Sequence, residues 1–303
     1  MKLLARVPLM AAALLAMLAT AQPAAAGESD KPTTPKTRRV LYNLDGDSCM
    51  WTKKGGKTPV VVSKDLVASQ KLQVHKILFL GNSITCCPPK YWGLAASTAE
   101  KDYAHLLAGA INANTGGSLT MIRSTAPVTH ADGSVDVGES NVVNIADVFE
   151  RAYASYNAAK LRKQIAWKAD LVVLQFGENI PPATFQAEVF KDGLKKLVAD
   201  LKQSSNPHIF MPSYILGSNA TVDEIKRNVC AEDPSHRVFV DMSRVGQDAS
   251  NMGDYGHPND KGMALIAETL FRAVLAHFAT VSASTAQTGF YDVPVYSVAL
   301  TGE

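Results

Sequence analysis

Short apolar runs alternate with longer amphipathic stretches along the chain after Gln70. The apolar runs have the length of strands and carry few polar residues, which is typical of strands that are buried on both faces of a parallel sheet. We expect strands at residues 74–81, 118–123, 141–145, 170–176, 208–213 and 236–241. The amphipathic stretches predict helices at residues 101–113, 146–167, 184–203, 221–232 and 259–279. This alternation predicts an α/β fold, a three-layer α/β/α sandwich around a mainly parallel sheet.

The first 26 residues have the pattern of an export signal. Lys2 and Arg6 give a positive start, an apolar run follows over residues 7–21, and residues 24–26 are alanines that suit a cleavage site. The apolar run is short for a membrane span, although an uncleaved membrane anchor is the alternative. We therefore expect a secreted or periplasmic protein whose mature chain begins near Gly27.

The rest of the chain divides into an extension, one large domain and a tail. Residues 27–70 are expected to form a polar linker followed by a small β-rich extension, because short strand-like runs there alternate with turn signals. The GGKT segment at 55–58 resembles the end of a phosphate loop but lacks the first glycine, so it is interpreted as a turn. Residues 71–280 are the predicted main domain, and residues 281–303 the C-terminal tail.

The charge balance argues against a polyanionic partner. Removing Lys2 and Arg6 with the signal leaves 28 of the 30 basic residues against 28 acidic ones. A chain near neutrality is not expected to bind nucleic acid or an anionic membrane. No stable membrane insertion is expected once the signal has been cleaved.

Four cysteines stand in a chain that is expected to reach an oxidising compartment: Cys49, Cys86, Cys87 and Cys230. Neighbouring cysteines rarely bond to each other, so Cys86 or Cys87 is expected to pair with Cys49 or Cys230, and the sequence leaves that choice open. No second cysteine pair and no histidine stand at zinc-ligand spacing. We expect neither a metal nor an organic cofactor.

Three polar segments follow predicted strands or precede the last predicted helix, and ligands bind at the carboxyl ends of such strands. Ser83 follows the first strand, where a sharp turn can expose a nucleophile, although a helix cap is the plainer interpretation. Asn179 follows the strand at 170–176 and can donate to an oxyanion. Asp254 and His257 are spaced so that the carboxylate can orient the imidazole, the alternative being a cap and a surface histidine.

Taken together and in this order, the segments resemble the SGNH (GDSL-type) hydrolase family. Gly81-Asn82-Ser83 matches its first block, GDS or GNS; Gly177-Glu178-Asn179 approximates the third block, GxND; and the residues from Asp254 to His257 match the fifth block, DxxH. The resemblance covers residues 74 to 279, roughly, and implies a five-stranded sheet of flavodoxin-like order.

The resemblance also implies a role for each site residue. Ser83 would be the nucleophile, His257 the general base and Asp254 its orienting carboxylate. The oxyanion donors would be Asn179 and the backbone N–H of Ser83. The family's second block supplies a glycine N–H that is missing here, so a backbone N–H near Ala146 is aligned in its place. The Asp that usually follows the third block is also replaced, by Ile180.

The expected function is that of an exported serine esterase that forms an acyl-enzyme. Its expected partner is a small-molecule or carbohydrate ester, with a carbohydrate acetyl ester favoured and a lipid or lysophospholipid ester as the rival. An alternative of another class is a non-catalytic carbohydrate-binding or envelope-assembly module on the same scaffold. The chain contains no G-x-S-x-G elbow, and Ser83 lies near the start of the domain with Asp254 just ahead of His257 near its end, which argues against an α/β-hydrolase.

Overall fold

The computed structural model describes residues 71–86, 91–117, 119, 141–217 and 219–279, and beyond them only the backbone of a few short strands and of the end of the last helix. The predicted signal, linker and most of the tail lie outside the described residues and stay predictions. In the predicted extension the backbone forms β1 (Val40–Leu41) and an antiparallel pair of β2 (Ser48–Thr52) and β3 (Pro59–Ser63). The remaining short strands are β5 (Val128–Thr129), β6 (Val135–Asp136) and β11 (Tyr296–Ser297).

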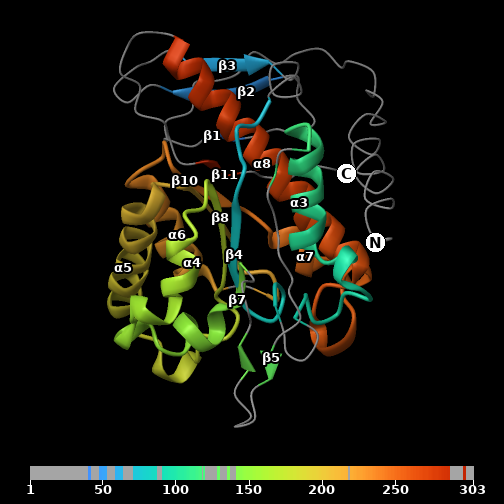
Figure 1. Ribbon diagram of the computed structural model, residues 1–303, viewed down its shortest axis with the longest axis vertical. Coiled ribbons are helices and arrows are strands. Elements are labelled where there is room, and N and C mark those ends of the chain that lie inside the picture. The colour runs from blue at the N-terminus through green and yellow to red at the C-terminus, as the bar shows by residue number, and fades with distance from the viewer. Residues whose placement is uncertain are drawn as a thin grey trace.

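A parallel sheet of five strands forms the centre of the fold (Figure 1). Its order is β10 (Arg237–Val240), β9 (His208–Pro212), β8 (Leu171–Gln175), β4 (Ile77–Gly81) and β7 (Val142–Asn144). Numbered along the chain, these strands lie in the order 2-1-3-4-5, which is the flavodoxin-like order. The predicted fold class is therefore confirmed, and only the expected strand at 118–123 lies outside the described residues, Leu119 excepted.

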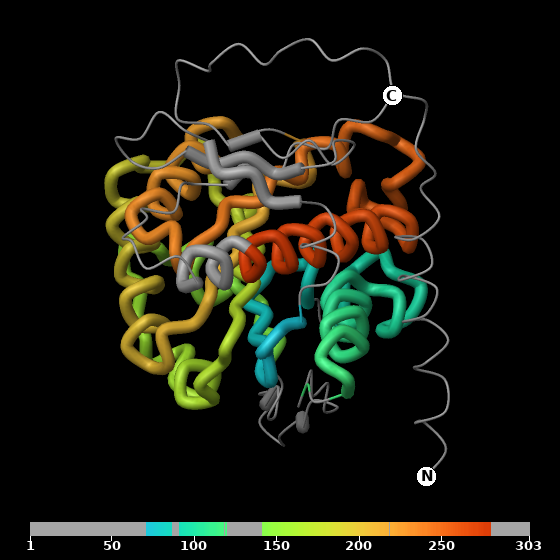
Figure 2. Tube along the Cα trace, turned by 90° about the horizontal axis from the view of Figure 1, so that it is seen from above, coloured from blue at the N-terminus to red at the C-terminus, as the bar shows by residue number. Residues whose placement is uncertain are grey.

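Helices cover both faces of the sheet, as Figures 1 and 2 show. One face carries α3 (Tyr103–Asn114), α7 (Ser243–Gln247) and α8 (Asp260–Ala286). The other carries α4 (Arg162–Ala166), α5 (Ala187–Ser205) and α6 (Ala220–Ala231). Two separate apolar clusters result, because successive side chains of a buried strand point to opposite faces.

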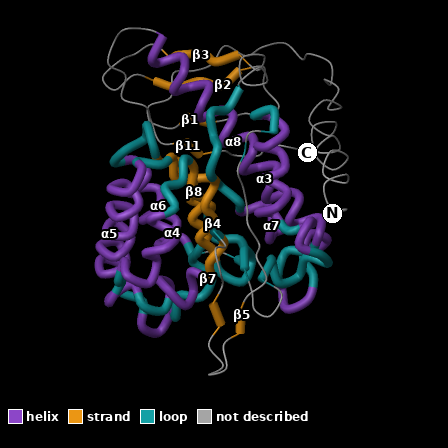
Figure 3. The backbone as a smooth tube through the Cα atoms, viewed as in Figure 1, coloured by secondary structure: helices purple, strands orange, loops and turns teal. Residues whose placement is uncertain are grey.

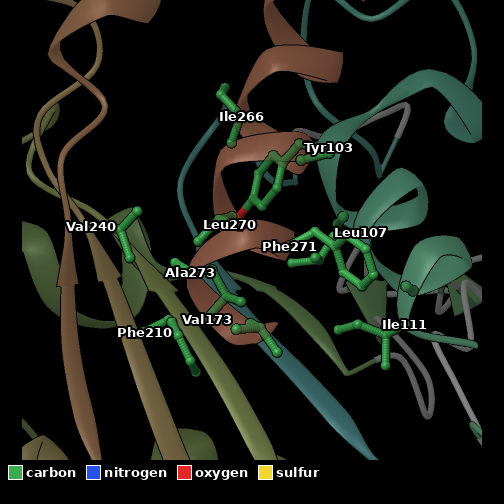
Figure 4. Packing of buried hydrophobic residues seen from close by; sticks show 14 of the residues in the cluster. Tyr103, Leu107, Ile111, Val173, Phe210, Val240, Ile266, Leu270, Phe271 and Ala273 are labelled. Carbon is green, nitrogen blue, oxygen red and sulfur yellow. The ribbon is translucent and has the colours of Figure 1, made fainter. Parts of the chain in front are cut away.

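Figure 4 shows the cluster under α3 and α8, in which alternate residues of the strands pack against these two helices. Phe210 and Val173 from the strands pack with Leu270 of α8, and Tyr103 of α3 joins them, all at most 1% exposed. The segment Asp260–Ala279 of α8 is apolar enough to cross a membrane, but 72% of it is buried in the fold. It is a core helix of this domain.

The prediction of a single helix over residues 146–167 is wrong. The structure divides this segment into a π turn, η2 (Ala146–Glu150), two 3-10 turns, η3 (Tyr153–Ser155) and η4 (Ala158–Leu161), and the short α4. The backbone leaves the helical region at Tyr156 and Asn157, and the side chain of Asn157 then caps the next turn through the N–H of Ala159 at 2.9 Å. Glu150 ends η2, just before the break, and its side chain is fully buried.

Three histidines lie together at the amino ends of β9 and β10. Nδ1 of His208 is 2.9 Å from Nε2 of His277, and the ring of His208 stacks on that of His236 with centroids 5.1 Å apart. Burial, helped by the nearby His236, lowers the pKa of His208 to about 4. Burial likewise holds the pKa of His277 well below its ordinary value, with both neighbouring histidines adding to the effect.

Acidification is therefore expected to destabilise the protein as the pH falls from 6.5, the ordinary histidine value, towards 4 or so. The unfolded chain binds protons at both sites in this range whereas the folded chain does not, so the free energy of unfolding falls, by on the order of 3 kcal/mol for His208 alone. Urea unfolding at a series of pH values measures the loss. A His208→Gln/His277→Gln variant should show a flatter pH profile, and an unchanged profile would argue against this source.

Candidate active site

The turns after β4 and β8 lie beside each other at the carboxyl edge of the sheet. Gly81, the last residue of β4, pairs in register with Gln175, the last residue of β8. Figure 3 shows loops gathered at this end of the strands. Two residues further along each chain segment stand Ser83 and Gly177, so the predicted nucleophile and the predicted oxyanion turn occupy neighbouring positions.

Ser83 and His257 are in hydrogen-bond contact although 174 positions separate them. Oγ of Ser83 lies 2.7 Å from Nε2 of His257, and both residues are half-buried. The other ring nitrogen, Nδ1, lies 3.0 Å from the backbone carbonyl oxygen of Tyr255. Since a carbonyl only accepts, Nδ1 carries a proton, and in this tautomer Nε2 can accept from the Ser83 hydroxyl. This is the arrangement of a serine with its general base.

The turn that carries Ser83 is held by its own backbone and by Thr85. The N–H groups of Thr85 and Cys86 both donate to the carbonyl of Asn82 at 2.8 Å. The Thr85 hydroxyl contacts the Tyr103 hydroxyl at 2.6 Å and donates to Gln175 at 3.2 Å. No helix begins at Ser83 within residues 71–86, and its hydroxyl contacts His257 rather than a backbone N–H. The helix-cap interpretation of Ser83 therefore has no support here.

Asp254 is not brought to the imidazole. Its side chain is exposed, and among the hydrogen bonds of the described residues none joins it to His257. The turn Asp254–Gly256 places Tyr255 in the left-handed region with φ of 57°, and the carbonyl of Tyr255 thereby takes the position beside Nδ1. The orienting role that the DxxH spacing predicts for Asp254 is therefore met in this structure by a backbone carbonyl.

Asn179 is fixed by a carboxylate that the sequence analysis missed. Glu150 is fully buried, and its Oε2 accepts from Nδ2 of Asn179 at 3.0 Å while its Oε1 accepts from the Asn179 backbone N–H at 3.3 Å. Oε1 also accepts from Asn82 of the nucleophile turn at 3.3 Å and from the N–H of Gly177. One signal was available in the sequence, since Glu150 stands at helical spacing from the apolar Ala146 and Tyr153.

The N–H of Ala146, aligned by resemblance to the second oxyanion donor, already has a partner. It donates to Oδ1 of Asn144 at 3.0 Å, and Ala146 is 2% exposed. The N–H of Ser83, by contrast, donates no hydrogen bond within the described parts of the chain. Nδ2 of Asn179 donates one hydrogen to Glu150 and has a second one to offer, so this second hydrogen and the Ser83 N–H are the candidate donors to an oxyanion.

Glu178 connects the same turns from the other side. Its Oε2 accepts from Asn82 at 2.6 Å and from Gln175 at 2.9 Å, and its Oε1 accepts from the N–H of Ile215 at 3.0 Å. Burial raises the pKa of Glu178, and the carboxylate of Glu150 adds to this, whereas the ammonium of Lys226 opposes it. The amide of Asn82 therefore bridges two acidic side chains, the fully buried Glu150 and the half-buried Glu178.

A cavity of about 270 Å³ opens at the carboxyl ends of β9 and β10. Its lining combines acidic, basic, hydroxyl and aromatic groups: Tyr214, Asp223, Arg227, Phe239 and Asp241 are among them. The guanidinium carbon of Arg227 lies 4.4 Å from the centroid of the Phe239 ring. The loop that lines this cavity also contacts the oxyanion turn, through the Ile215 N–H and Glu178.

The cysteines give no redox or metal site in the described part of the chain. Cys230 is buried in α6 without a disulfide, and burial raises the pKa of its thiol to about 12. Pairing of Cys230 with Cys86 or Cys87 is therefore not what the structure shows, while Cys87 and the side chain of Cys49 lie outside the described residues. In the described ranges no cluster of three His, Cys, Asp or Glu side chains is placed to hold a metal ion.

No protein-family model matches this chain, and no curated protein matches it in sequence. Among solved structures, the chain is similar to a family two carbohydrate esterase from Clostridium thermocellum in complex with cellohexaose. The sequence identity is 19% and the TM-score is 0.42, and the match covers 71% of this chain and 66% of the esterase chain. The chain thus spans just under two thirds of that relative.

Two further similar structures match over nearly their whole length. One is a family 3 carbohydrate esterase from Talaromyces cellulolyticus, at 19% identity and a TM-score of 0.45, over 68% of this chain and 99% of that one. The other is a psychrotrophic esterase from Pseudoalteromonas sp., at 15% identity and a TM-score of 0.42, over 66% and 96%. The likeness concerns the fold alone, and the roles of Ser83 and His257 rest on their geometry in this chain.

Proposed function

We propose that this protein is an exported serine esterase that hydrolyses carboxylic esters through an acyl-enzyme. The observation that carries the proposal is the contact of 2.7 Å between Oγ of Ser83 and Nε2 of His257, at the edge of the sheet where ligands of this fold class bind. A serine hydroxyl is a poor nucleophile unless a base takes its proton, and His257 is placed to do so. The pattern of the first 26 residues supports export.

In the first half of the reaction Oγ of Ser83 attacks the acyl carbon of the ester while its proton moves to Nε2 of His257. The Tyr255 carbonyl accepts a hydrogen bond from the Nδ1–H group and so stabilises the imidazolium. The carbonyl oxygen of the ester becomes an oxyanion that accepts from Asn179 and from the Ser83 N–H. The intermediate then collapses, the alcohol leaves with the proton from His257, and the acyl group stays on Ser83.

In the second half water repeats the attack. Nε2 of His257 takes a proton from the water, whose oxygen adds to the acyl carbon of the acyl-serine. The same donors hold the second oxyanion. When this intermediate collapses, Ser83 recovers its proton from His257 and the carboxylic acid is released. No other group is needed to balance the reaction.

The cavity at the carboxyl ends of β9 and β10, whose loop contacts Glu178 through the Ile215 N–H, supports a carbohydrate ester as the substrate. Asp223 and Asp241 disfavour an anionic ligand, while Arg227 disfavours a cationic one. Carboxylate and guanidinium groups beside an aromatic ring suit a neutral group with many hydroxyls, because each hydroxyl both donates and accepts. A long acyl chain would gain little from such a lining, and for this reason we favour an acetylated sugar over a lipid or lysophospholipid ester.

Substrate comparison tests the proposal. Nitrophenyl esters of increasing acyl length and acetylated sugars are to be compared by kcat/KM with the purified mature protein. We expect the rate to be greatest for acetyl esters and to fall with chain length. A preference for long acyl chains would favour the lipid ester. If no ester is hydrolysed, the non-catalytic binding module is the better interpretation.

A further inference from the structure

We propose that Glu150 is a positioning residue that fixes the direction of the Asn179 side-chain amide, so that this amide can donate to the oxyanion. The inference rests on the proposed esterase function and names a residue that lies outside the three motif segments. Glu150 reaches the site from the end of η2, the segment that follows β7.

The contacts of Glu150 are those of a group that only accepts. It is fully buried, and all the hydrogen bonds that the structure gives it come from N–H groups. Oε2 faces Nδ2 of Asn179 at 3.0 Å, and Oε1 faces the backbone N–H of the same residue at 3.3 Å. Glu150 therefore holds both the main chain and the side chain of the predicted oxyanion donor.

A side-chain amide has one end that donates and one end that accepts, and the two ends have nearly the same shape. A carboxylate cannot donate, so it selects the orientation in which Nδ2 of Asn179 faces Glu150. Nδ2 carries two hydrogens, and with one of them on Glu150 the second remains for the substrate oxygen. A carboxamide at position 150 would offer a donor as well as an acceptor. The amide of Asn179 could then rotate by about 180°, so that Oδ1, which cannot donate, faces the oxyanion.

Glu150 also couples the two turns that carry the chemistry. Nδ2 of Asn82 donates to Glu150 and to Glu178, so both acidic side chains hold the residue next to Ser83. Only Glu150 contacts Asn179, however, among the hydrogen bonds of the described residues. This difference provides a matched control, because Glu178→Gln changes the same hydrogen-bond network without removing a contact of the Asn179 side chain.

The test is a double-mutant cycle on hydrolysis of an acetyl ester, with Glu150→Gln, Asn179→Ala and the two combined. We expect Glu150→Gln to lower kcat by about 10- to 100-fold with KM changed less than about threefold, because the lost contact belongs to the transition state. If Glu150 acts through Asn179, the double variant should be within about twofold of Asn179→Ala. Glu178→Gln combined with Asn179→Ala should instead multiply the separate losses.

Two results overturn the inference: Glu150→Gln with the parental kcat, or losses that multiply when Glu150→Gln and Asn179→Ala are combined. If Ser83→Ala kept the parental rate, the proposed esterase function itself would be wrong. If Ser83→Ala is inactive but Glu150→Gln is fully active, the inference about Glu150 is wrong while the proposed function stands.

A stability measurement keeps the inference testable if Glu150→Gln folds poorly. Asn179→Asp places a second carboxylate against Glu150 and is expected to lower the Tm. Adding Glu150→Gln restores a donor facing an acceptor, so the Tm of the Glu150→Gln/Asn179→Asp protein should exceed that of Asn179→Asp alone. A Tm that is equal or lower means that the two side chains do not face each other as described.

Discussion

Replacing His257 by alanine is expected to lower kcat/KM for ester hydrolysis about a thousandfold or more, with little change in Tm. The reason is that Nε2 of His257 is the group in contact with the Ser83 hydroxyl, at 2.7 Å, and without it the hydroxyl keeps its proton. His257 is half-buried, so its loss leaves no large cavity in the core. Steady-state kinetics on a nitrophenyl acetyl ester, together with thermal unfolding, separate the loss of the base from a loss of folded protein.

Asp254→Ala is the matched comparison, and we expect it to change kcat/KM by less than about tenfold. Its side chain is exposed, whereas the Nδ1 proton of His257 is held by the Tyr255 carbonyl at 3.0 Å. A loss as large as that of His257→Ala would mean that the carboxylate, and not the carbonyl, orients the imidazole during the reaction.

Gly81→Ala is expected to destabilise the protein by roughly 3 kcal/mol or more, or to prevent folding. A β-carbon at this position would lie 1.8 Å from Oγ1 of Thr85, a distance that no packed pair tolerates. Thr85 has little freedom to move away, because its hydroxyl is held by Tyr103 and Gln175. Urea unfolding of the variant measures the effect.

Gly109→Ala is the control for that experiment. Gly109 lies within α3, where an added β-carbon meets no atom within 4 Å, so alanine should stabilise the helix by about 0.5–1 kcal/mol. If Gly81→Ala and Gly109→Ala were equally stable, the close contact of Thr85 with Gly81 would not be required for the nucleophile turn to fold.

Much of the fold could be predicted because its strands are buried on both faces. The runs ending at Gly81, Gln175 and Val240 have no polar face, and this feature separates a parallel sheet from the amphipathic helices around it. The break after Glu150 was not predictable from periodicity, because Ala146, Phe149 and Tyr153 keep helical spacing across it. Local capping by Asn157 and close packing of Tyr153 on Gly193 override that pattern.

The candidate site was predictable where a motif places a side chain directly after a strand, as with Ser83 and Asn179. It was not predictable where a short turn decides which atom faces the imidazole. The spacing of Asp254 and His257 is compatible with a carboxylate contact, but the left-handed conformation of Tyr255 gives the position to a carbonyl. The buried partner of Asn179 comes from a segment 29 residues away, and no local pattern relates them.

Labelling with a fluorophosphonate probe tests most directly whether Ser83 is an activated nucleophile. The probe forms a bond with a serine only where a base removes the hydroxyl proton. We predict that the mature protein is labelled, that His257→Ala is labelled far more slowly and that Ser83→Ala is not labelled. A parent protein that resists the probe, or a Ser83→Ala variant labelled as strongly as the parent, would contradict the account.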